Sequence, residues 1–232
     1  MGSRRAALLC WSSGKDSAWA LETLRRRDDL EVVGLLTTAN AEHDRVAMHA
    51  VRRSVLRAQA ECVGLPLHEI EIPAGCSNEQ YEAALAQAVA SAYARGVRAM
   101  AFGDLFLEDV RRYREDQLAG TGIEPLFPLW GEPTDALVRR MLASGLRARI
   151  TCVDPRVASG SLAGRELTLD LIEELPPEID PCGERGEFHT FAFDGRMFRR
   201  PVPIHAGETV ERDGFVFTDL VLQDGASEAT AR

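Results

Sequence analysis

The chain has 232 residues, of which 45% are hydrophobic and 27% charged, and its formal net charge is −9. This composition is typical of a soluble globular α/β chain and excludes disordered, collagen-like and coiled-coil proteins. The acidic balance argues against general nucleic-acid binding. No apolar run approaches the ~20 residues that span a bilayer, so we expect no membrane association.

The five cysteines are widely spaced, and no C-x-x-C pair is present. This spacing disfavours a zinc ribbon or a redox dithiol. The N-terminus has no long apolar segment typical of a signal peptide. Free thiols in a reducing compartment are the simplest interpretation, and we expect a cytoplasmic location.

The first half of the chain alternates short apolar strands with helices. We expect strands at 6–11, 31–38, 67–72 and 97–102, and helices at 17–24, 46–63 and 78–95. Gly64 and Pro66 end the second helix, and Gly96 is suited to capping the third. This order predicts an α/β fold with a doubly wound, mostly parallel sheet covered by helices on both faces.

The second half has a different texture. A charged helix is expected at 105–118, a loop at 120–125, a helix at 133–144 and a strand at 148–153. Alternating stretches at 188–193 and 214–222 predict a small β-rich extension. We therefore divide the chain into an α/β domain at 1–120 and a C-terminal extension with a β-rich tail at 121–232. Whether the extension covers the site or forms a homodimer contact is left open.

The most informative segment is the Ser12–Ser17 loop, between the first strand and the first helix. Its residues are Ser12, Ser13, Gly14, Lys15, Asp16 and Ser17. Small residues let the backbone wrap around a ligand, and N–H groups at a helix start favour an anion. Lys15 adds a positive charge. The loop therefore predicts a phosphate site at the carboxyl end of a parallel strand; a solvated Ser/Gly turn is the alternative.

This loop is not a Walker P-loop, since Asp16 follows Gly14-Lys15. It resembles the S-G-G-x-D-S loop of the PP-loop ATP pyrophosphatases, which are adenine nucleotide α-hydrolase-like proteins, and specifically the S-G-G-K-D-S form of the diphthine–ammonia ligase family. Ser13 stands where Gly is usual. Because Ser tolerates a positive φ poorly, this departure predicts a strained or slightly shifted loop.

Two further blocks carry the same resemblance. Residues 102–115 are similar to the family's F-G-D-I-x-L-E-D-x-R-x-Y-R-E block, and residues 180–190 to its D-P-C-G-E-N-G-E-F-H-T signature, with Arg185 in place of Asn. Gly103 and Asp104 end a strand at the edge of the sheet that carries the Ser12–Ser17 loop. The resemblance implies nucleotide contacts for these two residues. It implies substrate-facing roles for Glu108, Arg111 and Arg114, although their helical spacing also fits a solvated face with salt bridges.

The 182–190 block concentrates carboxylates and a histidine between two glycines. Glu184 and Glu187 are suited to holding Mg²⁺, orienting a substrate or acting as general base, and His189 to proton transfer or to holding the loop. We predict catalytic roles for Lys15, Asp16, Glu184, Glu187 and His189, and magnesium contacts for Asp16 and Glu184. Thr37 and Thr38 end the second strand, where the resemblance implies adenosine contacts, and His49 falls near a Met-x-His-like family feature.

The resemblance implies an ATP-dependent ligase that adenylates a carboxylate, releases pyrophosphate and forms an amide with ammonia or an amine. ATP and Mg²⁺ are the implied cofactors. The family's substrate is diphthine on elongation factor 2. The Ala- and Arg-rich composition is typical of high-GC bacteria, which lack that modification, so a small carboxylate or another protein is also open. The alternatives are an ATP- or AMP-binding protein, an uncoupled pyrophosphatase and, disfavoured by the cysteine pattern, a tRNA sulfur transferase.

Overall fold

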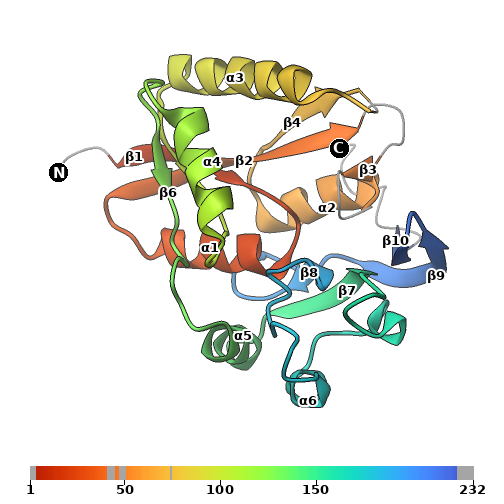
Figure 1. Ribbon diagram of the computed structural model, residues 1–232. Helices are drawn as coiled ribbons and strands as arrows, with labels where there is room; N and C mark the ends of the chain where they lie inside the picture. Colours follow the sequence, from red (N-terminus) through yellow and green to blue (C-terminus); the bar gives the residue numbers. More distant parts are fainter. Residues whose placement is uncertain (1–3, 41–44, 47–50, 74, 224–232) are drawn as a thin grey trace.

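A computed structural model of the chain (Figure 1) describes residues 4–40, 45–46, 51–73 and 75–223. Its main sheet contains five parallel strands in the order β4-β2-β1-β5-β6. These strands are β1 (Arg5–Cys10), β2 (Leu30–Asn40), β4 (Leu67–Ile72), β5 (Val97–Ala101) and β6 (Glu124–Leu126). β3 (Arg45–Val46) pairs antiparallel with the end of β2.

Helices cover both faces of this sheet. α1 (Lys15–Arg25) and α2 (Arg53–Val63) lie on one face, and α3 (Asn78–Ala94) and α4 (Glu108–Leu118) lie on the other (Figure 1). The strand alternation explains the two layers. Ala7 and Leu9 of β1 belong to the core that contains α1 and α2, whereas Leu8 packs in the core of α3. The predicted doubly wound fold is confirmed.

A smaller antiparallel sheet follows in the second half of the chain. Its strand order is β8-β7-β10-β9, formed by β7 (Arg147–Val153), β8 (Phe188–Asp194), β9 (Ile204–Arg212) and β10 (Phe215–Leu222). The connections carry α5 (Thr134–Ala143), the 3₁₀ turn η1 (Gly160–Leu162) and α6 (Leu169–Glu174). Ile150 and Phe191 of this sheet share one hydrophobic core with Leu21 of α1 and Leu56 of α2. The small sheet is thus packed against the helices that follow β1 and precede β4.

Several expected boundaries were wrong. The helix expected from residue 46 begins at Arg53, and Arg45–Val46 form a strand. Glu124 and Pro125, expected in a loop, pair with β5 together with Leu126; Pro125 is tolerated because β6 is an edge strand. β9 was not expected, because most of its residues are exposed and its sequence has no apolar alternation.

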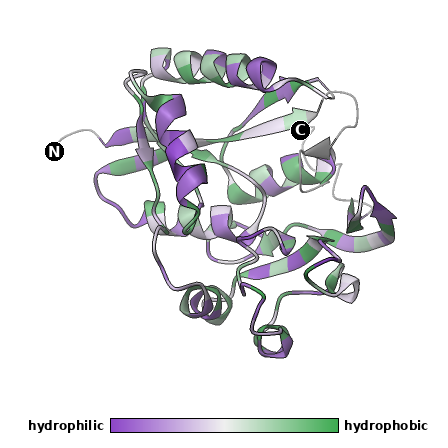
Figure 2. Ribbon diagram, in the orientation of Figure 1, coloured by the Kyte–Doolittle hydropathy of each residue, from purple (hydrophilic) through white to green (hydrophobic). Residues whose placement is uncertain are grey.

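α4 is largely hydrophilic (Figure 2), and among its residues only Leu118 is buried.

Candidate active site

The order of the main sheet creates a switch point between β1 and β5. From β1 the chain proceeds outward to β2 and β4, and it returns to form β5 and β6 on the other side. In open α/β sheets, ligands bind outside the carboxyl ends of strands at such a point. A cavity of about 490 Å³ lies there, lined by residues of both strand ends, α3, α4 and the 182–190 segment.

Most of the predicted site residues line this one cavity. They are Ser12, Gly14, Lys15, Asp16, Ser17, Thr37, Thr38, Gly103, Asp104, Arg114, Glu184 and His189. These residues are up to about 180 positions apart in the chain, and the two sheets bring them together. The cavity also has an apolar wall, with Leu85 and Val89 of α3 and Met100 of β5.

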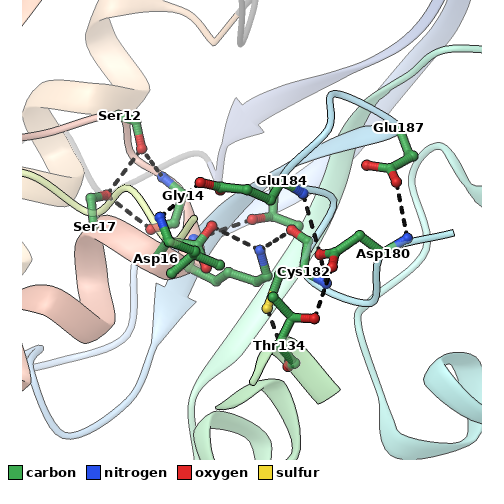
Figure 3. Close-up of polar contacts among 12 residues, drawn as sticks. Ser12, Gly14, Asp16, Ser17, Thr134, Asp180, Cys182, Glu184 and Glu187 are labelled. Atoms are coloured by element: carbon green, nitrogen blue, oxygen red, sulfur yellow. Dashed lines mark hydrogen bonds and ion pairs between the residues drawn. The ribbon is translucent and has the colours of Figure 1, made fainter. Parts of the chain in front are cut away.

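The Ser12–Ser17 loop is closed by its own hydroxyl groups (Figure 3). The Ser12 Oγ donates to the Ser17 Oγ at 3.2 Å and accepts a long contact of 3.4 Å from the Gly14 N–H. The Ser17 Oγ donates to the Gly14 carbonyl at 3.0 Å. Gly14 is the N-cap of α1 and has no side chain that could cap the helix. The Lys15 N–H donates to the Thr190 Oγ1 at 3.1 Å, and Gly14, Lys15, Asp16 and Ser17 all line the cavity. The N-terminal end of α1 therefore lies at the cavity, where an anion is favoured.

Ser13 has a φ of 70°, in the left-handed region that favours glycine. The strain expected from the sequence at this position is therefore confirmed. Ser13 does not line the cavity; it is fully buried, and its Oγ has no hydrogen-bond partner. Its carbonyl accepts two hydrogen bonds of 2.9 Å, from the Ala192 N–H and the Gln59 Nε2. These two hydrogen bonds thus hold the Ser13 backbone in place, whereas the burial of its unpartnered hydroxyl group destabilises the folded state.

Gly103 allows the end of β5 to approach the start of α1. A Cβ at this position would lie 3.0 Å from the Ser17 nitrogen and 3.1 Å from the Asp16 carbonyl carbon. Both are backbone atoms of α1, so they cannot move aside as a flexible side chain would. Gly103 therefore allows close packing of two segments that line the cavity.

Lys15 is almost completely buried, and its ammonium group joins the two halves of the protein. Its Nζ lies 2.8 Å from the Asp16 Oδ2 and also donates to the Cys182 carbonyl. Burial by itself lowers the pKa of Lys15, but the neighbouring Asp16 and Glu184 carboxylates raise it above its ordinary value. Lys15 is therefore cationic in the cavity at neutral pH.

The carboxylates of the 182–190 segment have different surroundings. Glu184 faces the cavity, and its Oε1 accepts a hydrogen bond of 2.7 Å from the Leu105 N–H. Burial raises the pKa of Glu184 to about 7. Glu187 points into its own loop instead, where it accepts a hydrogen bond of 2.9 Å from the Asp180 N–H (Figure 3). It also accepts a hydrogen bond of 3.0 Å from the Arg185 N–H. Glu187 thus holds the loop and does not line the cavity.

His189 lies on β8 and lines the cavity, and burial and then the Lys15 charge lower its pKa. The thiol of Cys182 is buried and lies 3.4 Å from the Thr134 carbonyl, to which it donates. Burial raises the pKa of Cys182 to about 12, so a thiolate nucleophile is disfavoured at this position.

Asp104 and Arg114 face each other without forming a hydrogen bond. The Arg114 Nε lies 3.8 Å from the Asp104 Oδ2, and both atoms are buried without a hydrogen-bond partner. The Arg114 guanidinium also lies 5.2 Å from the ring centroid of Phe102. Burial raises the pKa of Asp104, and Arg114 opposes this rise. The Arg114 Nε–H is therefore a free donor that suits an anionic ligand, whereas the Asp104 Oδ2 is a free acceptor that suits a donor or a cation.

Two of the three predicted residues on α4 are not part of this arrangement. Glu108 is exposed on α4, and the Arg111 guanidinium pairs with Glu115 at 2.8 Å while lying 4.9 Å and 4.8 Å from the rings of Phe127 and Trp130. Neither residue lines the cavity. His49 lies outside the described residues.

Magnesium contacts were predicted for Asp16 and Glu184, and both residues line the cavity. In the described part of the chain, no group of three or more His, Cys, Asp or Glu side chains could hold a metal ion by itself. However, Mg²⁺ is usually bound through one or two carboxylates together with phosphate oxygens and water. The buried Asp16 Oδ1 and Asp104 Oδ2 have no hydrogen-bond partner. These oxygens fit a metal that arrives with phosphate groups, and they do not fit a metal held by protein alone.

Two residues that build the site, Gln59 and Thr190, were not predicted as site residues from the sequence. The Gln59 Nε2, on α2, donates a hydrogen bond to the Ser13 carbonyl of the Ser12–Ser17 loop. The Thr190 Oγ1 accepts a hydrogen bond of 3.1 Å from the Lys15 N–H. A polar residue on the buried face of a predicted helix was the available signal for Gln59.

Among the described residues no helix is both long and apolar enough to cross a membrane.

Comparisons with known proteins match both halves of the chain to the same kind of protein. Residues 4–123 match the family model of the diphthamide synthase N-terminal domain, and residues 133–219 match that of the C-terminal domain. A diphthine–ammonia ligase of Danio rerio is 31% identical over 221 residues, which cover 88% of this chain and 82% of the relative. The Homo sapiens diphthine–ammonia ligase is 30% identical over 138 residues, covering 52% of this chain and 51% of the relative. That of Schizosaccharomyces pombe is 26% identical, and this chain covers only 36% of it.

Proposed function

Because the chain belongs to the diphthine–ammonia ligase family, we propose that it is an ATP-dependent ligase that adenylates a carboxylate and converts it to an amide. ATP is cleaved to AMP and pyrophosphate in this scheme. Ammonia or an amine supplies the nitrogen. Diphthine is the acceptor named for the relatives, and a small carboxylate or a carboxylate of another protein is the alternative.

The observation that supports this proposal most strongly is the start of α1. A helix N-terminus, the Ser12–Ser17 loop and the buried Lys15 ammonium converge on one cavity at the switch point of the sheet. Oriented N–H groups and a fixed cation are the groups that stabilise the charge of a departing pyrophosphate. Since they are already in place, they require little reorganisation during the reaction.

In the first step, an oxygen of the acceptor carboxylate attacks the α-phosphorus of ATP, and the bond from that phosphorus to the bridging oxygen of the pyrophosphate breaks. The products are an acyl-adenylate and pyrophosphate. The Ser12–Ser17 loop and Lys15 stabilise the negative charge that develops on the departing pyrophosphate. Arg114, whose Nε has no hydrogen-bond partner, is suited to holding the acceptor carboxylate or a phosphate in position.

In the second step, the nitrogen attacks the acyl carbon, AMP leaves, and the nitrogen loses a proton. Glu184 is suited to accepting this proton, because its pKa of about 7 provides both protonation states at neutral pH. Asp16 and Asp104 would hold magnesium together with the phosphates, and the ion would neutralise phosphate charge. Thr37 and Thr38, at the end of β2, would contact the nucleoside.

The experiment combines the purified protein, Mg²⁺, ATP labelled at the α-phosphate, ammonium and a panel of carboxylic acids, including a diphthine-containing protein. We expect labelled AMP whose formation depends on one member of the panel. Labelled ADP would contradict the assigned bond cleavage. AMP formation that is independent of every acceptor would favour the uncoupled pyrophosphatase, and ATP binding without any product would favour the nucleotide-binding protein.

A further inference from the structure

A neutral amide is buried directly beneath the Ser12–Ser17 loop. Gln59, near the middle of α2, has no solvent exposure. Its Nε2 donates to the Ser13 carbonyl at 2.9 Å and to the Ala192 carbonyl at 2.6 Å, and its Oε1 accepts from the Trp11 Nε1 at 2.7 Å. These contacts join the end of β1, the loop, α2 and β8 through one side chain.

The chemistry at this position requires an amide. Two carbonyl oxygens and one indole N–H surround the side chain, and Gln supplies the two donors and one acceptor that match them. A glutamate would place a charged acceptor against two carbonyl oxygens. An apolar side chain of equal length would leave buried polar groups without partners.

The hydrogen bond from Gln59 to the Ser13 carbonyl affects the orientation of a backbone N–H at the cavity. A trans peptide unit is planar, and its C=O and the following N–H point in opposite directions. Anchoring the Ser13 carbonyl toward Gln59 and the Ala192 N–H therefore turns the Gly14 N–H toward the opposite side. There it makes its long contact of 3.4 Å with the Ser12 Oγ, and both Gly14 and Ser12 line the cavity. The same anchor holds Ser13 at its φ of 70°, a conformation that Ser does not favour.

We propose that Gln59 is a positioning residue, which fixes the Ser13–Gly14 peptide so that the Gly14 N–H is presented to the phosphate groups of the nucleotide. The phosphate part of this proposal rests on the proposed function; the anchoring of Ser13 does not. Through its bond to Ala192, the same side chain ties the loop to β8, the strand that carries His189 and Thr190.

The first test compares Gln59→Met and Gln59→Glu with Val55→Ala. Val55 is fully buried on the same helix, one turn earlier, and has no polar group in contact with the loop. The affinity for inorganic pyrophosphate and the kcat and KM for ATP are measured at a temperature at which circular dichroism shows each variant to be folded. We expect both Gln59 variants to lose about tenfold in pyrophosphate affinity and in kcat/KM, and Val55→Ala to melt earlier with unchanged affinity. Wild-type affinity in both Gln59 variants would overturn the proposal.

The second test needs no nucleotide. The free energy of unfolding is measured for Gln59→Met, Ser13→Gly and the double variant, which form a double-mutant cycle. Glycine adopts a positive φ without strain, so we expect Gln59→Met to cost less stability when Gly occupies position 13. Additive effects would overturn the anchoring of Ser13. Wild-type protein that binds neither ATP nor pyrophosphate would instead remove the proposed function and, with it, the phosphate part of this proposal.

Discussion

The Lys15 ammonium donates a hydrogen bond to the Cys182 carbonyl, 167 residues later in the chain. Through this contact the first residue of α1 is joined to the segment that precedes β8. The same ammonium pairs with Asp16 at 2.8 Å, so its charge is held in a fixed position beside the cavity. The contact thus links the two sheets at the point where the phosphate groups are proposed to bind.

Removal of the Lys15 charge tests that position. We expect Lys15→Ala to lower kcat/KM for ATP by about 10²–10³-fold, the loss that follows removal of one group stabilising a developing anion. Asp16→Ala is expected to abolish turnover as well, because it removes both the partner of Lys15 and an oxygen suited to magnesium. Turnover is measured as release of labelled AMP.

The matched control is Arg26→Ala, which removes an exposed cation just beyond the other end of α1, where it pairs only with Glu22 in the described contacts. We expect normal turnover in this variant. Circular dichroism must show that Lys15→Ala and Asp16→Ala are folded. Wild-type turnover in both would remove the phosphate assignment of the Ser12–Ser17 loop.

Glu184 makes the stability of the protein depend on pH. Its pKa is about 7 in the folded protein, above the value of 4.5 expected without burial. A proton is therefore held by the folded state and already lost by the unfolded state between these values, so stability decreases as the pH rises from about 4.5 to about 7. Urea unfolding in this range should show a weaker pH dependence for Glu184→Gln, which keeps an oxygen for the Leu105 N–H.

The same variant tests Glu184 as the proton acceptor. In the wild-type protein, kcat/KM for amide formation is expected to rise with an apparent pKa near 7, because the ionised carboxylate is the active form. Glu184→Gln should lose this limb of the pH profile and most of its activity. A profile with an unchanged limb near pH 7 would assign the proton transfer to another group.

Gly103 is expected to tolerate no side chain. In Gly103→Ala the new methyl group would lie about 3.0 Å from backbone atoms of Asp16 and Ser17, so either β5 or the start of α1 must shift. We expect a destabilisation of about 1–3 kcal/mol together with weaker ATP binding. Thermal unfolding and calorimetric titration measure the two effects. Gly207→Ala, on the exposed β9, is the control, because the atom nearest to its new methyl group would be a side-chain methyl of Val221 at 3.2 Å, and the nearest backbone atom would be the Asp219 carbonyl oxygen at 3.5 Å.

Ser13→Gly should stabilise the protein. It removes the strain of a left-handed backbone, worth about 1–2 kcal/mol, and an Oγ that is buried without a partner. Part of this gain is offset by the larger chain entropy of glycine in the unfolded state, so we expect a net gain of about 1 kcal/mol. Ser13→Ala separates the two causes, since it removes the hydroxyl and retains the strain. Equal stability of the Gly and Ala variants would show that the backbone conformation costs little.

The sequence determined the features that depend on neighbouring residues. Short apolar runs alternating with helices indicated the parallel sheet, and the Ser12–Ser17 loop between a strand and a helix indicated an anion site. Ser13 in place of the usual Gly predicted the strain that its φ of 70° confirms. These features follow from local sterics and from which residues must be buried, and both are recorded in the order of the amino acids.

Tertiary structure decided which distant residues meet. Local patterns treated Glu184 and Glu187 alike, yet folding turns one carboxylate into the cavity and the other into its own loop. The fully buried Gln59 acquires its role only because α2 and β8 pack around the end of β1. Such contacts depend on how two sheets share one core, and periodicity along a chain reports burial without identifying the partner. The charge on Glu184 likewise depends on burial that the tertiary structure alone creates.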